Sequence, residues 1–205
     1  MPRTLVIDTA TAACSVALLE GERVVAANHV VVGRGHAERL VPMIAELPGG
    51  GRAEEIVVDV GPGSFTGIRV GIAAARGLAL GWGVPVRGYS SLALIAAAAV
   101  SDGETAPLAV VLEGGHGEVF MQGFAASPLM PTEPLASLRP EAALAALAGR
   151  TAVGNGVRWL TQLDASLAVR EALPEAAKAH LLPPELAALP PRPLYGRAPD
   201  AKLPS

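Results

Sequence analysis

A glycine-rich segment in the first third of the chain constrains its fold more than any other feature. Residues 61–71 read GPGSFTGIRVG, directly after the apolar run 56–60 and before a long stretch of small and apolar residues. The apolar run predicts a buried strand, and Ser64 is a residue type that caps helices. A strand, a glycine-rich turn and a helix N-terminus in this order are typical of α/β folds. They also leave backbone N–H groups that can bind an anion.

The length and composition favour a globular protein with a substantial core. The 205 residues fit one large domain or two small lobes, and 51% of them are hydrophobic against 17% charged. No apolar run reaches the roughly 18 residues that a membrane-spanning helix needs. The N-terminal apolar run is short and is interrupted by Asp8, which does not fit a signal peptide. We therefore expect a cytoplasmic protein without a membrane partner.

Charge and metal-ligand patterns exclude several functions. The net charge is −3, the 16 Lys and Arg residues form no run, and aromatic residues make up 3% of the chain. Strong direct binding of nucleic acid is therefore not expected. The single cysteine, Cys14, rules out an internal disulfide and a cysteine-rich zinc site. The four histidines lack metal-binding spacing, and His36 is expected at the surface or in an interface; no metal site is predicted.

The first half of the chain predicts a mixed sheet with covering helices. Short loops between the first three strands imply antiparallel pairing, whereas a strand that follows a helix has to cross over and pair in parallel. The predicted strands are residues 4–9, 14–19, 24–32, 56–60 and 85–88, and the predicted helices are residues 36–47, 64–82 and 91–100.

The second half repeats this arrangement in shorter form. It predicts strands at residues 108–112, 119–124 and 151–153, and helices at residues 140–147 and after Gly154-Asn155-Gly156. We therefore predict two lobes, residues 1–102 and residues 103–205, with an extended, proline-rich tail from about residue 183. Repeated lobes of this kind build the actin-like, sugar-kinase and chaperone-ATPase fold (ASKHA), an α/β fold with mixed sheets flanked by helices.

The helix at residues 64–82 is apolar nearly all round. Phe65, Ile68 and Ala75 belong to one stripe at helical spacing, while Gly67 and Gly71 begin a second stripe of small residues. Such a helix has to be covered on more than one side. Two arrangements fit this pattern: one stripe faces the sheet and the other a helix of a partner chain, or the helix is internal and covered by the helix at residues 36–47.

Polar residues near strand ends raise the prospect of a nucleotide site. Asp8, Thr9 and Thr11 end the first strand, where an acid and hydroxyls can hold a metal-bound phosphate. The second acid that an ATP-splitting enzyme needs has one weak candidate, Glu113 in the turn Glu113-Gly114-Gly115. The residues expected to contact a nucleotide are Asp8, Thr9, Thr11, Gly61, Gly63, Ser64, Gly154 and Gly156. No catalytic set emerges, because Ser64 lies outside a nucleophile elbow and Cys14 sits in an apolar strand.

The combined motifs resemble the TsaB family. The matching segments are residues 5–18 (LVIDTATAACSVAL), 36–44 (HAERLVPMI), 61–71, 117–120 (GEVF) and 193–202 (PLYGRAPDAK). The resemblance is dense over the first half and in the tail. It departs from the family at Val60, at Glu113-Gly114-Gly115 and in the short region 173–193. The departure at Glu113-Gly114-Gly115 concerns any nucleotide or tRNA contact of that loop. The short region 173–193 implies that a C-terminal helix of the family is trimmed in this chain.

The resemblance implies an actin-like fold and a non-catalytic role in threonylcarbamoyl modification of the adenosine beside the anticodon in tRNA. It implies pairing with TsaD, the metal- and nucleotide-binding transferase, together with the ATPase TsaE, and a homodimer through the same surface. Contact with tRNA would be indirect, and ATP or ADP would be a ligand of the complex rather than a cofactor of this chain. The implied interface residues are His36, Glu38, Arg39, Leu40, Met43, Ile44, Leu47, Phe65, Gly67, Ile68, Gly71, Ala74 and Ala75.

Two enzymatic hypotheses compete with this one. An ATP-dependent phosphotransferase of the same superfamily would use Asp8, Thr9, Thr11 and Glu113. A glycoprotease-like hydrolase would need metal ligands that the histidine spacing does not supply. If the interface hypothesis holds, a Gly71→Leu change should abolish partner binding by blocking close helix approach.

Overall fold

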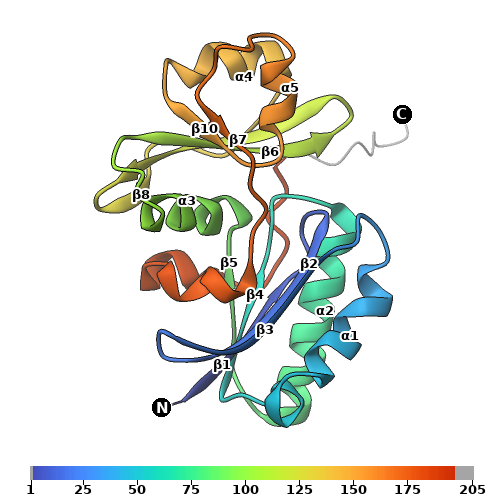
Figure 1. Cartoon of the computed structure of the whole chain (residues 1–205). Helices are drawn as coiled ribbons and strands as arrows, with labels where there is room; N and C mark the ends of the chain where they lie inside the picture. Colours follow the sequence, from blue (N-terminus) through green and yellow to red (C-terminus); the bar gives the residue numbers. More distant parts are fainter. Residues whose placement is uncertain (1, 197–205) are drawn as a thin grey trace, which may run out of the picture.

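The computed structural model describes residues 2–196, which form two sheets and three helical layers (Figure 1). Helices α1 (His36–Ala45) and α2 (Phe65–Trp82) cover the outer face of the first sheet. Helix α3 (Ser91–Ser101) and the 3-10 helix η2 (Ala176–Leu181) lie between the two sheets. Helices α4 (Pro140–Leu147) and α5 (Val157–Thr161) cover the second sheet. The predicted α/β fold with mixed sheets flanked by helices is confirmed.

The first sheet has the strand order β3-β2-β1-β4-β5. The predicted antiparallel pairing of the first three strands is confirmed, and β4 and β5 extend the sheet in parallel. The strands are β1 (Arg3–Asp8), β2 (Ala13–Glu20), β3 (Arg23–Val31), β4 (Glu55–Asp59) and β5 (Val86–Tyr89). Because β1, β4 and β5 are parallel, their carboxyl ends meet at one edge.

The second sheet has the order β11-β10-β6-β7-β8, with β9 also paired to β7. Its strands are β6 (Leu108–Gly115), β7 (Glu118–Ala126), β8 (Leu129–Pro131), β9 (Ala136–Leu138), β10 (Thr151–Val153) and β11 (Val169–Arg170). The sequence did not predict β8, β9 and β11, which have two or three residues each and carry no measurable periodicity.

Local capping explains where the main helices begin. The hydroxyl of Ser64 accepts a hydrogen bond from the Gly67 N–H at 3.2 Å, and that of Ser90 accepts one from the Leu92 N–H at 3.2 Å. The predicted Ser64 cap is confirmed, and Ser90 rather than Ser91 caps α3. Two further 3-10 helices are η1 (Pro48–Gly51) and η3 (Pro184–Ala187).

Among residues 2–196, no helix combines the length and the apolar character that spanning a membrane requires.

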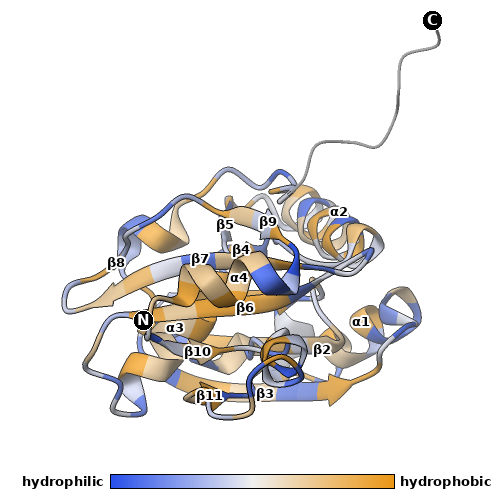
Figure 2. Ribbon diagram, turned by 90° about the horizontal axis from the view of Figure 1, so that it is seen from above, coloured by the Kyte–Doolittle hydropathy of each residue, from blue (hydrophilic) through white to orange (hydrophobic). Residues whose placement is uncertain are grey.

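One apolar core runs through both sheets. It joins Val6 and Tyr89 of the first sheet to Val110 and Phe124 of the second, with Leu94 of α3 between them. Helix α3 is buried over most of its length because alanine side chains let it fit between two sheets. Figure 2 shows the apolar character of β6, β7 and α3 in the interior. The predicted boundary between residues 102 and 103 falls in the connection from α3 to β6, and the division into lobes stays a prediction.

Ile68 and Ala75 of the first stripe and Gly67 and Gly71 of the second stripe face the sheet of their own chain, whereas Phe65 of the first stripe is exposed. A Cβ atom on Gly67 would overlap the Thr9 carbonyl oxygen, and one on Gly71 would lie 2.5 Å from the Thr9 hydroxyl oxygen. That hydroxyl donates a hydrogen bond of 2.7 Å to the Gly67 carbonyl oxygen. Gly67 and Gly71 therefore allow α2 to lie close to the end of β1. Helix α1 packs beside α2 over the same sheet.

This contact predicts opposite effects for two glycines of one helix. We expect Gly67→Ala to lower the free energy of unfolding by at least ~2 kcal/mol, because the new methyl group has to displace backbone. Gly77 has nothing within 4 Å of an added Cβ. Gly77→Ala should therefore raise stability by up to ~1 kcal/mol through helix propensity. Urea unfolding of both variants measures the difference, and equal stabilities would show that α2 does not press on β1.

Candidate functional site

Two buried carboxyl groups lie side by side where the parallel strands β1 and β4 end. The Tyr89 hydroxyl, from the end of β5, donates a hydrogen bond of 2.8 Å to Asp8 Oδ2. Asp59 Oδ1 accepts the Gly61 N–H at 2.7 Å, and Asp59 Oδ2 accepts the Ser91 hydroxyl at 2.6 Å. The acid pair therefore ties the strand ends to the glycine-rich turn and to the start of α3.

Burial decides the protonation of this pair. Burial and the neighbouring Asp59 raise the pKa of Asp8 well above its ordinary range, and burial raises the pKa of Asp59 to about 6. Among the described residues, Asp8 Oδ1 is the one buried side-chain oxygen or nitrogen without a hydrogen-bond partner. A proton held on Asp8 turns this oxygen into a donor. We infer that the pair carries one shared proton at neutral pH.

The residues expected to bind a nucleotide are packed against other parts of the chain. Asp8 and Thr9 are at most 1% exposed. The Ser64 N–H donates to the Ala10 carbonyl oxygen at 2.6 Å, and a side chain on Gly63 would overlap that same carbonyl group. Thr11 is 8% exposed. Asp8 and Thr9 are closed off from a phosphate, whereas Gly63 is half-buried and Ser64 exposed, and the nucleotide expectation in the first lobe stays a prediction.

The second-lobe candidates also have structural partners. Gly156 N–H donates to the Val111 carbonyl oxygen at 3.0 Å, and a side chain on Gly154 would overlap that carbonyl group. Glu113, the weak second acid, forms an ion pair with Arg158 at 2.6 Å. Its backbone N–H donates to Asn155 Oδ1 at 3.1 Å. The structure thus joins the two turns that the sequence singled out, as a packed corner of the second sheet.

Most residues of the predicted interface are buried within the chain, and their assignment to an interface stays a prediction. They cannot meet a partner unless the helices leave the sheet. The buried members are His36, Leu40, Met43, Ile44, Leu47, Gly67, Ile68, Gly71 and Ala75, while Glu38, Arg39 and Phe65 are exposed and Ala74 is half-buried.

His36 illustrates how such a residue is held within the chain. We expect it at the surface or in an interface, and in the folded chain its side chain is 7% exposed. Its Nε2 lies 2.9 Å from the Thr11 carbonyl oxygen and 3.2 Å from that of Ala13. The ring therefore ties the start of α1 to the turn between β1 and β2.

The outward side of the α1 and α2 layer carries apolar residues that the sequence interpretation missed. Val41 is 63% exposed, Phe65 57% and Leu80 87%. Exposed Ala73 and Gly77 lie between Phe65 and Leu80 on α2. These five residues are called the outer face below. Helical periodicity could have revealed these residues, because Val41 and Leu80 occupy helix positions away from those that face the sheet.

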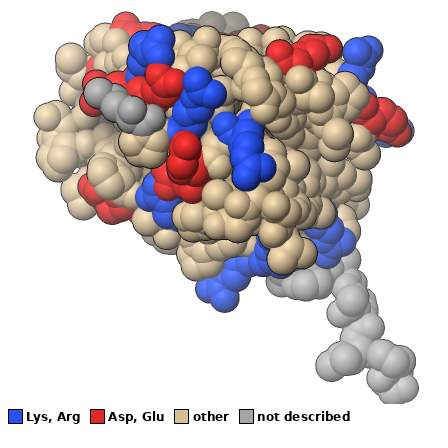
Figure 3. Space-filling model, turned by 90° about the horizontal axis from the view of Figure 1, so that it is seen from below, with Lys and Arg blue, Asp and Glu red and all other residues tan. Residues whose placement is uncertain are grey.

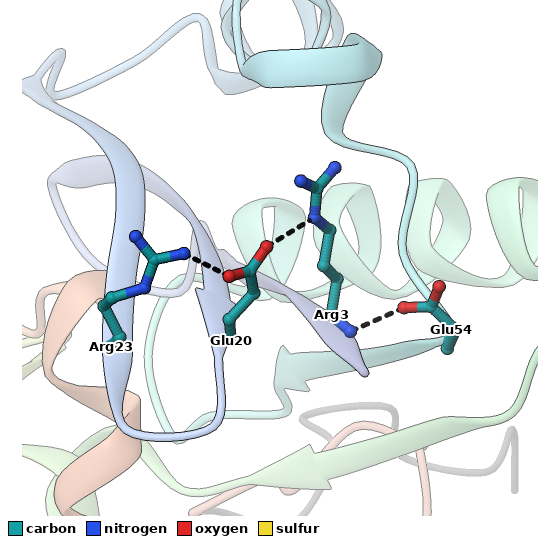
Figure 4. Close-up of polar contacts among 4 residues, drawn as sticks. All are labelled: Arg3, Glu20, Arg23 and Glu54. Atoms are coloured by element: carbon teal, nitrogen blue, oxygen red, sulfur yellow. Dashed lines mark hydrogen bonds and ion pairs between the residues drawn. The ribbon is translucent and has the colours of Figure 1, made fainter. Parts of the chain in front are cut away.

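Surface charges do not separate into a basic field on the face drawn in Figure 3, where acidic side chains lie beside several of the basic ones. Glu20 forms ion pairs with both Arg3 and Arg23, as Figure 4 shows. Hydrogen bonds from these arginines lower the pKa of Glu20. Arg87 is paired with Glu55 at 2.7 Å. Charge-driven contact with a phosphate backbone is therefore weakened at these arginines.

The remaining reactive groups also have structural environments. Burial raises the pKa of the Cys14 thiol to about 11, so the thiol stays protonated and is a poor nucleophile. Among residues 2–196, no three His, Cys, Asp or Glu side chains gather closely enough to hold a metal ion.

Sequence comparison confirms the resemblance to TsaB. Residues 29–127 match the family model described as TsaD, tRNA N6-adenosine threonylcarbamoyltransferase. The chain is 38% identical over 123 residues to the tRNA threonylcarbamoyladenosine biosynthesis protein TsaB of Escherichia coli, covering 58% of this chain and 53% of that protein. It is 34% identical over 98 residues to TsaB of Bacillus subtilis, covering 45% and 43%. The chain thus spans about half the length of the curated relatives it matches.

Structural comparison confirms the fold over nearly the whole chain. A Pseudomonas aeruginosa protein described as similar to peptidase YEAZ superposes with a TM-score of 0.79 and 29% identity, covering 96% of this chain and 100% of that chain. The ethanolamine utilization protein EutJ of Carboxydothermus hydrogenoformans gives 0.51 and 12%, covering 89% and 90%. At that identity EutJ supports the actin-like fold alone.

The acid pair predicts how stability changes with pH. Its folded-state pKa values lie above the ordinary value of 3.8. The contribution of the pair to the free energy of unfolding is therefore full at low pH, and it is lost as the pH rises through about 6. Asp8→Asn keeps an acceptor for Tyr89 and cannot ionise. Between about pH 5 and about pH 8, we expect this variant to lose at least ~1.4 kcal/mol less stability than the unmodified protein.

Thermal unfolding of both proteins across this pH range measures the difference. The exposed Asp164, whose pKa the hydrogen bonds from Ser166 lower, provides the matched control. Asp164→Asn should leave the profile in this range unchanged. Parallel profiles for the unmodified protein and Asp8→Asn would contradict the shared proton.

Proposed function

We propose that this chain, as a relative of the TsaB proteins, serves tRNA threonylcarbamoyladenosine biosynthesis as a non-catalytic partner of a TsaD-type threonylcarbamoyltransferase. The curated relatives named TsaB support the pathway, and the TsaD family match supports common descent with the transferase. The proposal places the protein in the cytoplasm, where its contact with tRNA is indirect.

The packing of the glycine-rich turn is the observation that carries the non-catalytic assignment. In an ATP-using enzyme of this fold, a nucleotide phosphate has to approach the acid at the end of the first strand. Here Ser64 and Gly63 lie against Ala10, and Asp8 is fully buried beneath them. Opening this turn would remove the hydrogen bond from the Gly61 N–H to the buried Asp59, which costs free energy. A nucleotide of the assembly is therefore assigned to the partner.

The outer face supports a role in binding another protein. Val41, Phe65 and Leu80 are large apolar residues left exposed on one helical layer. Phe65 and Leu80 lie near opposite ends of α2, with the exposed Arg69 and Arg76 between them, so the three residues are separate apolar contact points on a partly charged surface. The small residues Ala73 and Gly77 between them leave room for a helix of the partner to approach closely. We assign this face to TsaD in the complex and to a second copy in the isolated protein, with TsaE joining the assembly.

An ATP-dependent phosphotransferase is the competing function. It would require Asp8 and Glu113 to act on a bound nucleotide. The ion pair of Glu113 with Arg158 and the burial of Asp8 disfavour it. Measurable ATP turnover by the isolated chain that is lost in Asp8→Asn would favour the enzyme over the scaffold.

The scaffold proposal predicts a complex that depends on the outer face. Light scattering after mixing the chain with TsaD from the same organism should show an assembly replacing the separate species. We expect Leu80→Glu and Val41→Glu to weaken binding at least ~30-fold, as loss of an interface hot spot does. Leu163 is 46% exposed in the second half of the chain. Leu163→Glu is the matched control and should bind normally.

Normal assembly of both outer-face variants would reject this surface. Separate species for the unmodified protein, with TsaE and ATP also present, would reject the partnership itself. Gly71→Leu no longer serves as an interface test, because Gly71 faces Thr9 and the change would disturb the fold.

A further inference from the structure

Residues 189–196 cross the molecule as an extended segment, called the latch below. It starts at the edge of the first sheet, where Leu189 and Gly88 exchange two backbone hydrogen bonds of 2.7 and 2.9 Å. A side chain on Gly88 would come within 3.2 Å of the carbonyl oxygens of Leu189 and Pro190. The latch therefore begins as a short added strand beside β5 and lies close to it.

The middle of the latch binds the glycine-rich turn. The Leu194 N–H donates to the Val60 carbonyl oxygen at 2.8 Å, directly before that turn. A side chain on Gly61 would lie 2.9 Å from the Leu194 carbonyl oxygen. From α2, Arg76 donates to the Pro191 carbonyl oxygen at 2.7 Å. The turn is thus held from β1 on one side and from the latch on the other.

The end of the latch builds an aromatic cluster on the first turns of α2. The rings of Tyr195 and Phe65 stack with centroids 5.7 Å apart. The Arg69 guanidinium lies 3.4 Å from the Phe65 centroid and donates to the Tyr195 hydroxyl at 3.1 Å. Cation–π and stacking contacts of this kind stabilise partly exposed side chains. Gly196 then packs under the Phe120 ring of β7, so the latch also reaches the second sheet.

The latch borders the outer face. At 100° per residue, Phe65, Arg69 and Arg76 share one side of α2, next to the side that presents Ala73, Gly77 and Leu80. Phe65 belongs to both sets: it is stacked on Tyr195 and still 57% exposed. The orientation of this outer-face residue therefore depends on a segment about 130 residues away in the sequence.

We propose that the latch fixes the glycine-rich turn and the first turn of α2, and so presets the outer face for a partner protein. The part that concerns the partner rests on the proposed function. The contacts of Leu194, Tyr195 and Arg76 hold the turn in place, and Tyr195 completes the surface with its own exposed ring. Without the latch, Phe65 loses its stacking partner and the partner must order the turn itself.

The test uses the full chain with point changes in the latch. Tyr195→Ala removes the stacked ring and the acceptor for Arg69, whereas Leu194→Pro removes the N–H that binds Val60. Hydrogen–deuterium exchange should show amides of residues 61–67 exchanging at least tenfold faster in both variants, with β6 and β7 unchanged. Met130 is 51% exposed in β8. Met130→Ala is the matched control and should leave all amides unchanged.

Binding to purified TsaD then tests the functional part. We expect Tyr195→Ala to weaken binding at least fivefold while Met130→Ala binds normally. Unchanged exchange of residues 61–67 in both latch variants would overturn the proposal. Faster exchange with normal TsaD binding would overturn its link to the partner surface. If the unmodified chain does not bind TsaD, the proposed function fails, and the exchange result alone decides whether the latch holds the turn.

Discussion

The structure depends on the backbone contact between α2 and the end of β1. Gly67 lies on the Thr9 carbonyl oxygen, and the Thr9 hydroxyl returns a hydrogen bond to the Gly67 carbonyl oxygen. This contact sets how deeply α2 sits on the sheet. It thereby places the glycine-rich turn over Asp8 and directs Phe65 and Leu80 outward. One small residue on the helix thus controls both the closed interior site and the exposed surface.

The acid pair beneath that turn places two carboxyl groups in a buried site, where a charged carboxylate is unfavourable. Asp8 and Asp59 occupy the place where the parallel strands end, which is where α/β folds put ligand sites. Here the hydrogen bonds of Tyr89, Ser91 and the Gly61 N–H, together with a shared proton, take the place of a ligand. The acids have become structural, because they link three strand ends to the turn.

The sequence predicted the elements far better than the faces of those elements. Apolar runs and helix caps located five strands of the first sheet and its helices, because those signals are local. The burial of His36 depended on the carbonyl groups of Thr11 and Ala13, and that of Gly67 on Thr9, and both are contacts between distant segments. The TsaB resemblance and the actin-like fold were predicted from ordered motifs. Residues 197–202 of the matching tail lie outside the described residues.

Helix α3 gives the molecule a mechanical character that its architecture alone does not imply. Proteins built from two lobes with a ligand between them can swing those lobes apart. In this chain the space between the sheets is filled by the alanine-rich α3, which packs on the second sheet, and by η2, which packs between α3 and the first sheet. Separating the sheets would expose α3 to water along most of its length. The packed layer between the sheets therefore opposes their separation.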